Sequence, residues 1–357
     1  MEIVAVTGAS GLVGSFVVDR LLKCGRYKEI RLIDRKPSVR PDTDDTRIRP
    51  FVLDIVDEGA LERALKGCSA VVHCAHATMP WKYTDQKTND DIWRDNLSAT
   101  EILVDTMLRL GVKHLVHVGD AYSALPIEDN YGLGEHVFND YPRNYILGDY
   151  GESRTRAEMY ARNAVSRGPL QGVFLRPVHV HAEQASSSWL TLMEMAQEGH
   201  VPYVKGDRRG LHQFIYAGNL AAIVERCLVL LTTDSNRISS EIVYCVDETN
   251  VMPFRDFLEQ RVRSPRFSSQ MMMSFEKAFL HQSLTYIKHM LGLEVPKDAL
   301  SFTMFRFLFA KTIGFSNRKQ RLLLDFIPET SFEESMKRSL QMTKERSFIR
   351  RPAVRSG

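Results

Sequence analysis

Short apolar runs alternate along the first half of the chain with longer segments in which apolar residues recur at helical spacing. The apolar runs predict buried strands, and the short connections through helices predict that these strands are parallel. The predicted strands are 3–6, 29–35, 51–55, 70–75, 112–118 and 172–177, and the clearest helices are 58–66, 91–110 and 150–166. This pattern predicts an α/β fold with a doubly wound parallel sheet.

A glycine-rich turn, Thr7–Gly14, joins the first predicted strand to a helix that ends at Gly25. Gly8 permits the tight turn out of the strand, Gly11 lets a pyrophosphate approach the backbone, and Gly14 lets the helix pack closely on the sheet. The N–H groups and the positive end of the helix dipole then face the phosphates. The strand before the glycines and the helix after them favour a dinucleotide-binding turn over an ordinary one.

Acidic residues end two of the predicted strands. Asp34 lies about twenty residues after Gly14, where an acid that binds the adenosine ribose of NAD is expected. Its carboxylate would accept hydrogen bonds from the ribose hydroxyls and repel the 2′-phosphate of NADP. Arg35 follows at once and could stabilise that phosphate, so NAD is favoured and NADP stays open. Asp54 lies near the expected place of the adenine.

Composition narrows the functional classes. Of the 357 residues 44% are hydrophobic, enough for a large core, and the net charge of +3 offers no basic field for nucleic acid. The five cysteines are scattered and lack C-x-x-C spacing, which fits a reducing compartment. The first apolar run is too short for a secretory signal, and no stretch has the length of a membrane span. We therefore expect a cytoplasmic protein.

The second half of the chain departs from the regular alternation. Segments 186–199 and 217–232 have helical spacing and 241–246 is a further strand, so part of this half should complete the sheet. We predict an NAD(P)-binding domain over 1–180 and a smaller, mostly helical substrate-binding or lid region over 181–345. Parts of 212–247 return to the sheet. Residues 346–357 form a basic tail that we expect to be disordered.

Residues 267–315 are rich in Met and Phe, with Lys and Arg between them. Three interpretations compete. The favoured one is a helical cap packed on the core. The second is an apolar substrate lid, because flexible Met side chains suit irregular apolar ligands. The third is a helix lying on a membrane surface. The second and third interpretations can both be true.

A tyrosine and an arginine share one helix face after a long predicted loop, 120–149, of a length that is usually functional. Tyr150 begins the helix and Arg154 follows one turn later, so the phenol and the guanidinium lie side by side. His73, Cys74 and His76 invite a metal interpretation, but no second ligand cluster has zinc-site spacing. We expect no metal, and a strand that runs past the cofactor.

Several segments carry a resemblance to a known family: Thr7–Gly14, Asp34, Asp54, Val71–Ala75, Asp95–Thr100, Leu175–Pro177, Phe214–Ala221, Asn317–Gln320 and Ile327–Pro328. With them the chain resembles an extended short-chain dehydrogenase/reductase, and most of all the 3β-hydroxysteroid dehydrogenase/isomerase family. The resemblance covers about residues 1–345. It implies a Rossmann sheet, and NAD(P)-dependent chemistry at a secondary alcohol or ketone of a sterol-like, apolar substrate.

In that family a Tyr-x-x-x-Lys pair does the chemistry, helped by a Ser or Thr after the fifth strand. The tyrosine exchanges a proton with the substrate oxygen, the lysine lowers the pKa of the tyrosine and holds the nicotinamide ribose, and the serine donates a hydrogen bond to the oxygen. Tyr150 matches the tyrosine. Arg154 stands at the lysine position, and Asp120 aligns with the serine.

The two departures differ in their physical consequences. Arg154 keeps a positive charge that favours the phenolate, although a planar guanidinium fits the ribose differently from an ammonium. An ionised Asp120 has no proton to donate, would raise the pKa of Tyr150 and would repel an oxyanion. Asp120 could act if burial kept it protonated. It could also form an ion pair with Arg154, and the two charges would then cancel each other.

The resemblance assigns Tyr150, Arg154 and Asp120 to catalysis. It assigns to the cofactor Thr7, Gly8, Ser10, Gly11, Leu12, Val13, Gly14, Asp34, Arg35, Asp54, Ile55, Cys74, Ala75, Asn96, Tyr150, Arg154 and Pro177. Two rival functions stay open: a non-catalytic NAD(P)-binding sensor or scaffold, and a sugar-nucleotide epimerase or reductase. Peripheral association with a membrane such as the endoplasmic reticulum, and a homodimer, are further hypotheses.

Overall fold

The computed structural model of the chain describes residues 2–37, 45–85, 88–135, 141–183, 187–202, 204, 209–262 and 273–339. The predicted basic tail, 346–357, lies outside these residues, as do Met271 and Met272 of the Met- and Phe-rich region.

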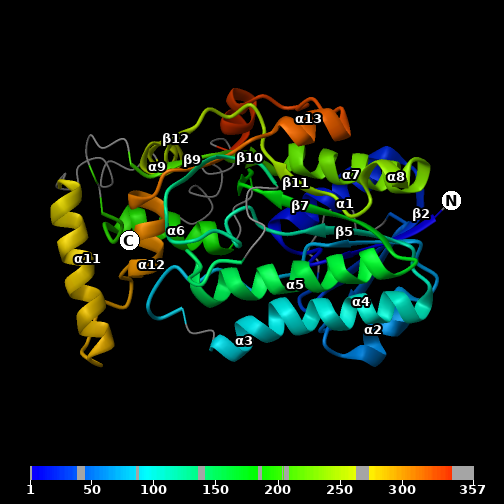
Figure 1. Cartoon of the computed structure of the whole chain (residues 1–357), viewed down its shortest axis with the longest axis horizontal. Coiled ribbons are helices and arrows are strands. Elements are labelled where there is room, and N and C mark those ends of the chain that lie inside the picture. The colour runs from blue at the N-terminus through cyan, green and yellow to red at the C-terminus, as the bar shows by residue number, and fades with distance from the viewer. Residues whose placement is uncertain are drawn as a thin grey trace, which may run out of the picture.

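A parallel sheet of seven strands forms the centre of the molecule (Figure 1). Its order is β11-β7-β5-β4-β1-β2-β3. The strands are β1 (Glu2–Thr7), β2 (Tyr27–Asp34), β3 (Ile48–Val52), β4 (Ala70–His73), β5 (His114–Val118), β7 (Gln171–Pro177) and β11 (Ile242–Cys245). The chain runs outward from β1 first to one side and then to the other, and ligands bind sheets of this kind where the order reverses. The predicted doubly wound sheet is confirmed, and β11 returns to its edge as expected.

Helices cover both faces of the sheet (Figure 1). On one face α4 (Ala99–Leu110) packs against α2 (Glu58–Leu65) and α5 (Gly148–Arg167). On the other, α1 (Leu12–Cys24) packs against α7 (Ala217–Thr233), followed by α8 (Ser235–Ile238) and α13 (Arg318–Leu324). The apolar spacing explains these faces, because Val17, Val18 and Leu21 of α1 are all fully buried.

Two predictions near the sheet need correction. The third strand was predicted at 51–55 but is β3, Ile48–Val52. Because β3 is an edge strand, Pro50 costs it no essential hydrogen bond, and its exposed residues hide the apolar signal. The loop predicted at 120–149 contains β6 (Asn130–Leu133), which pairs with the distant β13 (Ile313–Phe315). A partner so far along the chain leaves no local pattern.

The helix predicted at 91–110 is not regular. It begins as α3 (Asn89–Trp93), with Thr88 and Asp91 in a reciprocal capping box, and continues as α4. Between the two lies a π-helical turn, η1 (Arg94–Ser98), which buries Asp95 and Asn96. Such turns often mark functional sites. Asn96 of this turn forms a hydrogen bond to Ala77, which lies shortly after β4.

The remaining elements build the end of the molecule opposite the N-terminus (Figure 1). They are α6 (Ser187–Glu198), α9 (Phe254–Val262), α11 (Phe275–Met290), α12 (Phe302–Phe305), the π-helical turn η2 (Arg306–Ala310), and the short strands β8 (His179–His181), β9 (Leu211–His212), β10 (Phe214–Tyr216) and β12 (Met252–Pro253). Phe305, Phe307 and Leu308 are fully buried, as the packed-cap interpretation of this region requires. The helix α11 is largely exposed, so the packed-cap interpretation does not hold for this helix.

Candidate active site

A cavity of about 530 Å³ opens at the carboxyl ends of the central strands. Most residues assigned to the site from the sequence line it: Gly8, Ser10, Gly11, Leu12, Val13, Gly14, Asp34, Arg35, Asp54, Ile55, Cys74, Ala75, Asp120, Tyr150, Arg154 and Pro177. Residues from six strand ends and from the starts of α1 and α5 therefore meet in one place, as the fold requires of a dinucleotide site.

The glycine turn has the shape of a phosphate cradle. Gly8 has a φ of +66°, and a Cβ there would lie 2.8 Å from the backbone nitrogen of Ala75. A Cβ on Gly14 would lie 2.1 Å from the carbonyl oxygen of Gly8, so only glycine allows α1 to begin this close to β1. No side chain caps the start of α1, and its first residues line the cavity. Its N–H groups are thus available to an anion.

The side chains of Asp34 and Arg35 have different hydrogen-bond partners at the rim of the cavity. The carboxylate of Asp34 accepts hydrogen bonds from the backbone N–H groups of Ser10 (2.9 Å) and Lys36 (3.0 Å), which hold it beside the glycine turn. The guanidinium of Arg35 instead binds the carboxylate of Asp95 with two hydrogen bonds, of 2.9 and 3.1 Å. Arg35 is therefore held by the π-helical turn rather than by Asp34.

Thr7 does not line the cavity and supports its wall from behind. The hydroxyl of Thr100 donates to the carbonyl of Asn96 (2.7 Å), so it accepts from Nε2 of His73 (3.0 Å). Nδ1 of His73 must then accept from the hydroxyl of Thr7 (2.7 Å), whose oxygen also accepts from the N–H of Ala75 (3.3 Å). Both nitrogens of His73 are thus occupied, which leaves no metal ligand there.

Asn96 also lies behind the cavity. Its side-chain oxygen accepts from the N–H of Ala77 (2.8 Å), and its amide donates to the hydroxyl of Ser153 (2.9 Å). Ser153 in turn donates to the carbonyl of Tyr150 (3.1 Å). Asn96, which was assigned to the cofactor from the sequence, does not line the cavity and instead ties the segment after β4 to the turn of α5 that carries Tyr150.

Tyr150 and Arg154 are both buried and both line the cavity. Burial raises the pKa of Tyr150 most, Arg154 lowers it and Asp120 raises it further, so the phenol keeps its proton at neutral pH. One Nη of Arg154 donates to the carbonyl of Val118 (3.2 Å). Its buried Nε has no hydrogen-bond partner among the described residues. An orphaned donor in the cavity wall calls for a ligand acceptor.

Asp120 faces the same cavity without pairing to Arg154. One carboxyl oxygen accepts from the N–H of Tyr122 (2.7 Å), and within the described part of the chain no ion pair joins Asp120 to Arg154. Asp120 and Arg154 therefore do not form the close ion pair considered from the sequence, although the charge of Arg154 still lowers the pKa of Asp120. Burial raises the pKa of Asp120 despite the charge of Arg154. A raised pKa favours the protonated form of the carboxyl, which a donor to the substrate oxygen would need.

Sequence reasoning missed the aromatic part of the cavity. Met79, Trp81, Tyr122, His179 and Trp189 line it together. A signal was present for His179, which lies two residues after Pro177 at the end of a predicted strand. The two tryptophans come from irregular or distant segments, so no periodicity could point to them. Cys74 also lines the cavity, and burial raises the pKa of its thiol to about 12, which makes it unreactive.

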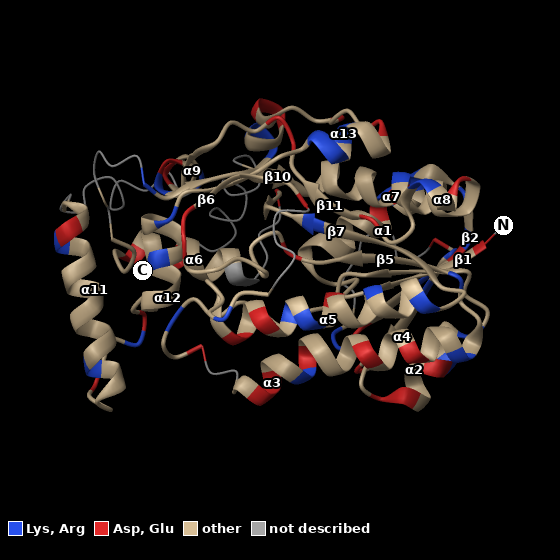
Figure 2. Cartoon of the chain, in the orientation of Figure 1, with Lys and Arg blue, Asp and Glu red and all other residues tan. Residues whose placement is uncertain are grey.

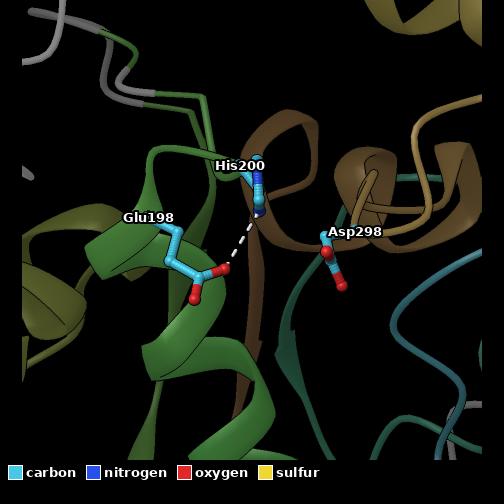
Figure 3. Close-up of side chains that lie close together, drawn as sticks. All are labelled: Glu198, His200 and Asp298. Carbon is cyan, nitrogen blue, oxygen red and sulfur yellow. Dashed lines mark ion pairs between the residues drawn. The ribbon is translucent and has the colours of Figure 1, made fainter.

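One group of potential metal ligands occurs among the described residues, away from the cavity. Glu198 and His200 are 3.5 Å apart, and Asp298 faces them from another segment (Figure 3). The ammonium of Lys82 lies 2.5 Å from Asp298 and neutralises it. Because a bound cation would meet that ammonium, we interpret the group as a surface ion-pair cluster.

The fold and the site together define an extended short-chain dehydrogenase/reductase, a class of NAD-dependent oxidoreductases. The family model for the 3-beta hydroxysteroid dehydrogenase/isomerase family matches residues 5–276. The chain belongs to this family.

Named relatives are remote. The chain is 25% identical to the 3 beta-hydroxysteroid dehydrogenase/Delta 5-->4-isomerase of Vaccinia virus (strain Copenhagen) over 289 residues, which cover 76% of this chain and 82% of the relative. It is 22% identical to the decarboxylating sterol-4-alpha-carboxylate 3-dehydrogenase of Mus musculus over 94% of this chain and 89% of the relative.

Solved structures share the fold across almost the whole chain. The dTDP-glucose 4,6-dehydratase of Streptomyces venezuelae, solved with NAD, aligns with a TM-score of 0.70 at 18% identity, covering 97% of this chain and 98% of that one. The UDP-glucose 4-epimerase of Thermus thermophilus, also solved with NAD, aligns with a TM-score of 0.64 at 17% identity, covering 96% and 99%. At such identities the alignments establish the fold alone.

Proposed function

We propose that this protein uses NAD to interconvert a secondary alcohol and a ketone on an apolar, steroid-like substrate, with Tyr150 as the acid/base. The single observation that carries the proposal is that Tyr150 and Arg154 line one cavity with the glycine turn and Asp34. The aromatic wall of Trp81 and Trp189 supports an apolar substrate rather than a sugar nucleotide.

The cavity fits NAD in three respects. The glycine cradle and the uncapped start of α1 suit a pyrophosphate. The carboxylate of Asp34 suits the hydroxyls of the adenosine ribose, whereas the guanidinium that a 2′-phosphate would need is bound to Asp95. The unpartnered Nε of Arg154 suits a hydroxyl of the nicotinamide ribose. Bound NAD would supply hydride transfer at the nicotinamide.

The chain's own residues would handle the proton. Because the pKa of Tyr150 is raised, its phenol is ready to donate a proton to a carbonyl oxygen during reduction. Oxidation needs the phenolate, which the charge of Arg154 favours.

The test is hydride transfer by the purified protein. It is given NAD and then NADP, first with a panel of 3β-hydroxysteroids and then with UDP-glucose, while the fluorescence of the reduced nicotinamide is followed. Steroid oxidation with NAD supports the proposal. Turnover of UDP-glucose alone would overturn it in favour of sugar-nucleotide chemistry. Tight NAD binding with no turnover of a wide panel would favour the sensor or scaffold.

Asp120→Asn is expected to move the pH profile of steroid oxidation toward lower pH by about one unit. The charge of Asp120 raises the pKa of Tyr150, so its removal lowers that pKa and increases the phenolate fraction at a given pH. Reduction near neutral pH should change little, because the phenol is protonated in both forms. The measurement is kcat/KM for oxidation across the alkaline range.

Asp149→Asn is the matched control. It removes the same charge from the residue next to Tyr150, but Asp149 is exposed and does not line the cavity. Solvent screening should leave the pH profile where it is. An Asp120→Asn profile that stays in place, or moves to higher pH, would contradict the coupling between Asp120 and Tyr150.

We further propose that α11 lies on an anionic membrane surface. Among the described residues no helix has the length and apolar character to cross a bilayer. Yet α11 and the turn after it expose a run of large apolar side chains, with few charges along the middle of the helix (Figure 2). They are Phe279, Leu280, Leu284, Tyr286, Ile287, Met290, Leu291 and Leu293. The cations Arg209, Arg306 and Lys311 line a neighbouring hollow together with the single acid Asp129, and this excess of positive charge suits anionic headgroups.

The double variant Leu284→Asp, Ile287→Asp is expected to stay at the bottom of a flotation gradient when wild-type protein rises with phosphatidylserine vesicles. Leu322→Asp on α13, a leucine that is 70% exposed at a distance from α11, is the control and should still float. Wild-type protein that ignores the vesicles would refute the proposal. A dimer that the double variant dissociates would instead assign this surface to a second copy of the chain.

A further inference from the structure

His179 of β8 lines the cavity, and the function proposed above gives it no role. Its imidazole is enclosed by rings, with centroid distances of 4.6 Å to Tyr122, 5.5 Å to Phe307 and 6.4 Å to Trp189. This apolar cage fixes the ring in place. It also makes a charged imidazole costly inside the cavity.

A chain of hydrogen bonds determines where the protons of this site lie. Nε2 of His212 is 3.1 Å from the carbonyl oxygen of Phe307. A carbonyl can only accept, so Nε2 of His212 carries the proton. Nδ1 of His212 lies 3.2 Å from Nε2 of His179.

Both imidazoles are neutral near pH 7. Burial lowers the pKa of His212 to about 4, and burial together with His212 lowers the pKa of His179 well below its ordinary value. A neutral imidazole has one N–H, so Nδ1 of His212 is bare and must accept. Nε2 of His179 therefore donates to it, and the remaining nitrogen, Nδ1 of His179, carries no proton.

Nδ1 of His179 makes no hydrogen bond with any residue that the structure describes, and it is not among the fully buried unpartnered atoms of those residues. It is thus an accessible acceptor in a wall that is otherwise largely apolar. A carbonyl group of a ligand facing it would set two acceptors against each other, whereas a hydroxyl group would donate to it.

We propose that His179 is a specificity-determining residue whose bare Nδ1 accepts a hydrogen bond from a second hydroxyl group of the substrate. The inference rests on the proposed function for the class of substrate, because Tyr150 serves the oxygen that is oxidised or reduced. The preferred substrate is then an apolar diol. The matching hydroxyketone, with a carbonyl in place of the second hydroxyl, is disfavoured.

The first measurement is the tautomer of His179, by ¹⁵N–¹H correlation of the imidazoles in labelled full-length protein with NADH. His179→Phe assigns the resonance. The expected result is a protonated Nε2 and a bare Nδ1, whose ¹⁵N resonance moves when androst-5-ene-3β,17β-diol is added but not when dehydroepiandrosterone is added. A protonated Nδ1, or a resonance that neither steroid moves, would overturn the inference even if no steroid is turned over.

The second measurement compares kcat/KM for these two steroids. Wild-type protein should favour the diol by about tenfold or more, mainly through KM, as one buried hydrogen bond allows. His179→Phe should bring the ratio of the two kcat/KM values to about one. The control, His181→Phe, alters a buried histidine on the same strand that does not line the cavity, and should keep the preference.

The outcomes separate the two claims. A wild-type preference that survives His179→Phe overturns the role of His179 and leaves the proposed function intact. Absence of steroid turnover in wild-type protein counts against the proposed function, and the ¹⁵N measurement then decides the role of His179 by itself.

Discussion

Replacement of Tyr150 by phenylalanine is expected to lower kcat for hydride transfer by about 10³-fold, within the range that general acid–base catalysis contributes. Phenylalanine keeps the ring in its buried place and removes only the hydroxyl that would pass the proton. Binding of NAD should persist, because the glycine turn and Asp34 are untouched. Steady-state kinetics with a steroid that the wild-type protein oxidises measure kcat. Quenching of tryptophan fluorescence measures the binding of NAD.

Tyr145→Phe is the matched control for Tyr150→Phe. Tyr145 is half-buried just before α5 and does not line the cavity, so its hydroxyl should be dispensable for turnover. A second variant, Arg154→Lys, restores the family pattern and should retain activity, because the positive charge beside the phenol is kept. Full activity of Tyr150→Phe would remove Tyr150 from the proton path.

Glu158→Gln is expected to lower the free energy of unfolding by about 3–5 kcal/mol, the cost of breaking a buried ion pair by removing one partner. The carboxylate of Glu158 binds Nε and Nη2 of Arg176 at 2.8 and 2.7 Å, and the two side chains are only 4% and 9% exposed. With a neutral amide opposite it, the guanidinium of Arg176 stays buried without a counter-charge. Chemical denaturation followed by circular dichroism measures the loss.

Glu152→Gln provides the comparison on the same helix. Glu152 pairs with Arg156 one turn away, but the pair is partly exposed, so its loss should cost less than about 0.5 kcal/mol. Equal and small losses for Glu152→Gln and Glu158→Gln would contradict the structural role of the buried pair. The pair also bears on the site, because Glu158 lies on the helix of Tyr150 and Arg176 precedes Pro177 of the cavity.

Local patterns were sufficient for the cofactor half of the site. The glycine turn, Asp34 and the i, i+4 pair of Tyr150 and Arg154 were all predicted, because each is defined by short-range spacing on one strand or helix. Parallel strands place their carboxyl ends at one edge, so residues predicted at separate strand ends were bound to meet. They do line one cavity.

Residues whose roles depend on distant partners were harder to predict. The chain alone left open whether Asp120 forms an ion pair with Arg154. No such pair occurs among the described residues, and burial raises the pKa of Asp120 although the charge of Arg154 lowers it. The helix over 91–110 was predicted as regular, but it contains a π-helical turn. From that turn Asn96 forms hydrogen bonds to Ala77 and Ser153 in other segments. Such contacts join segments that no sequence window spans.

The sequence by itself determined the doubly wound sheet, the glycine cradle and the placement of Tyr150 and Arg154 on one helix face, because hydrophobic periodicity and residue spacing act locally and the topology of parallel strands then places them. Only the tertiary structure decided which distant residues line the cavity and where the protons of its wall lie. His179 becomes an acceptor through His212 and the carbonyl of Phe307, a residue far along the chain. The protonation of a buried group depends on its neighbours in space, and those neighbours exist only once the chain has folded.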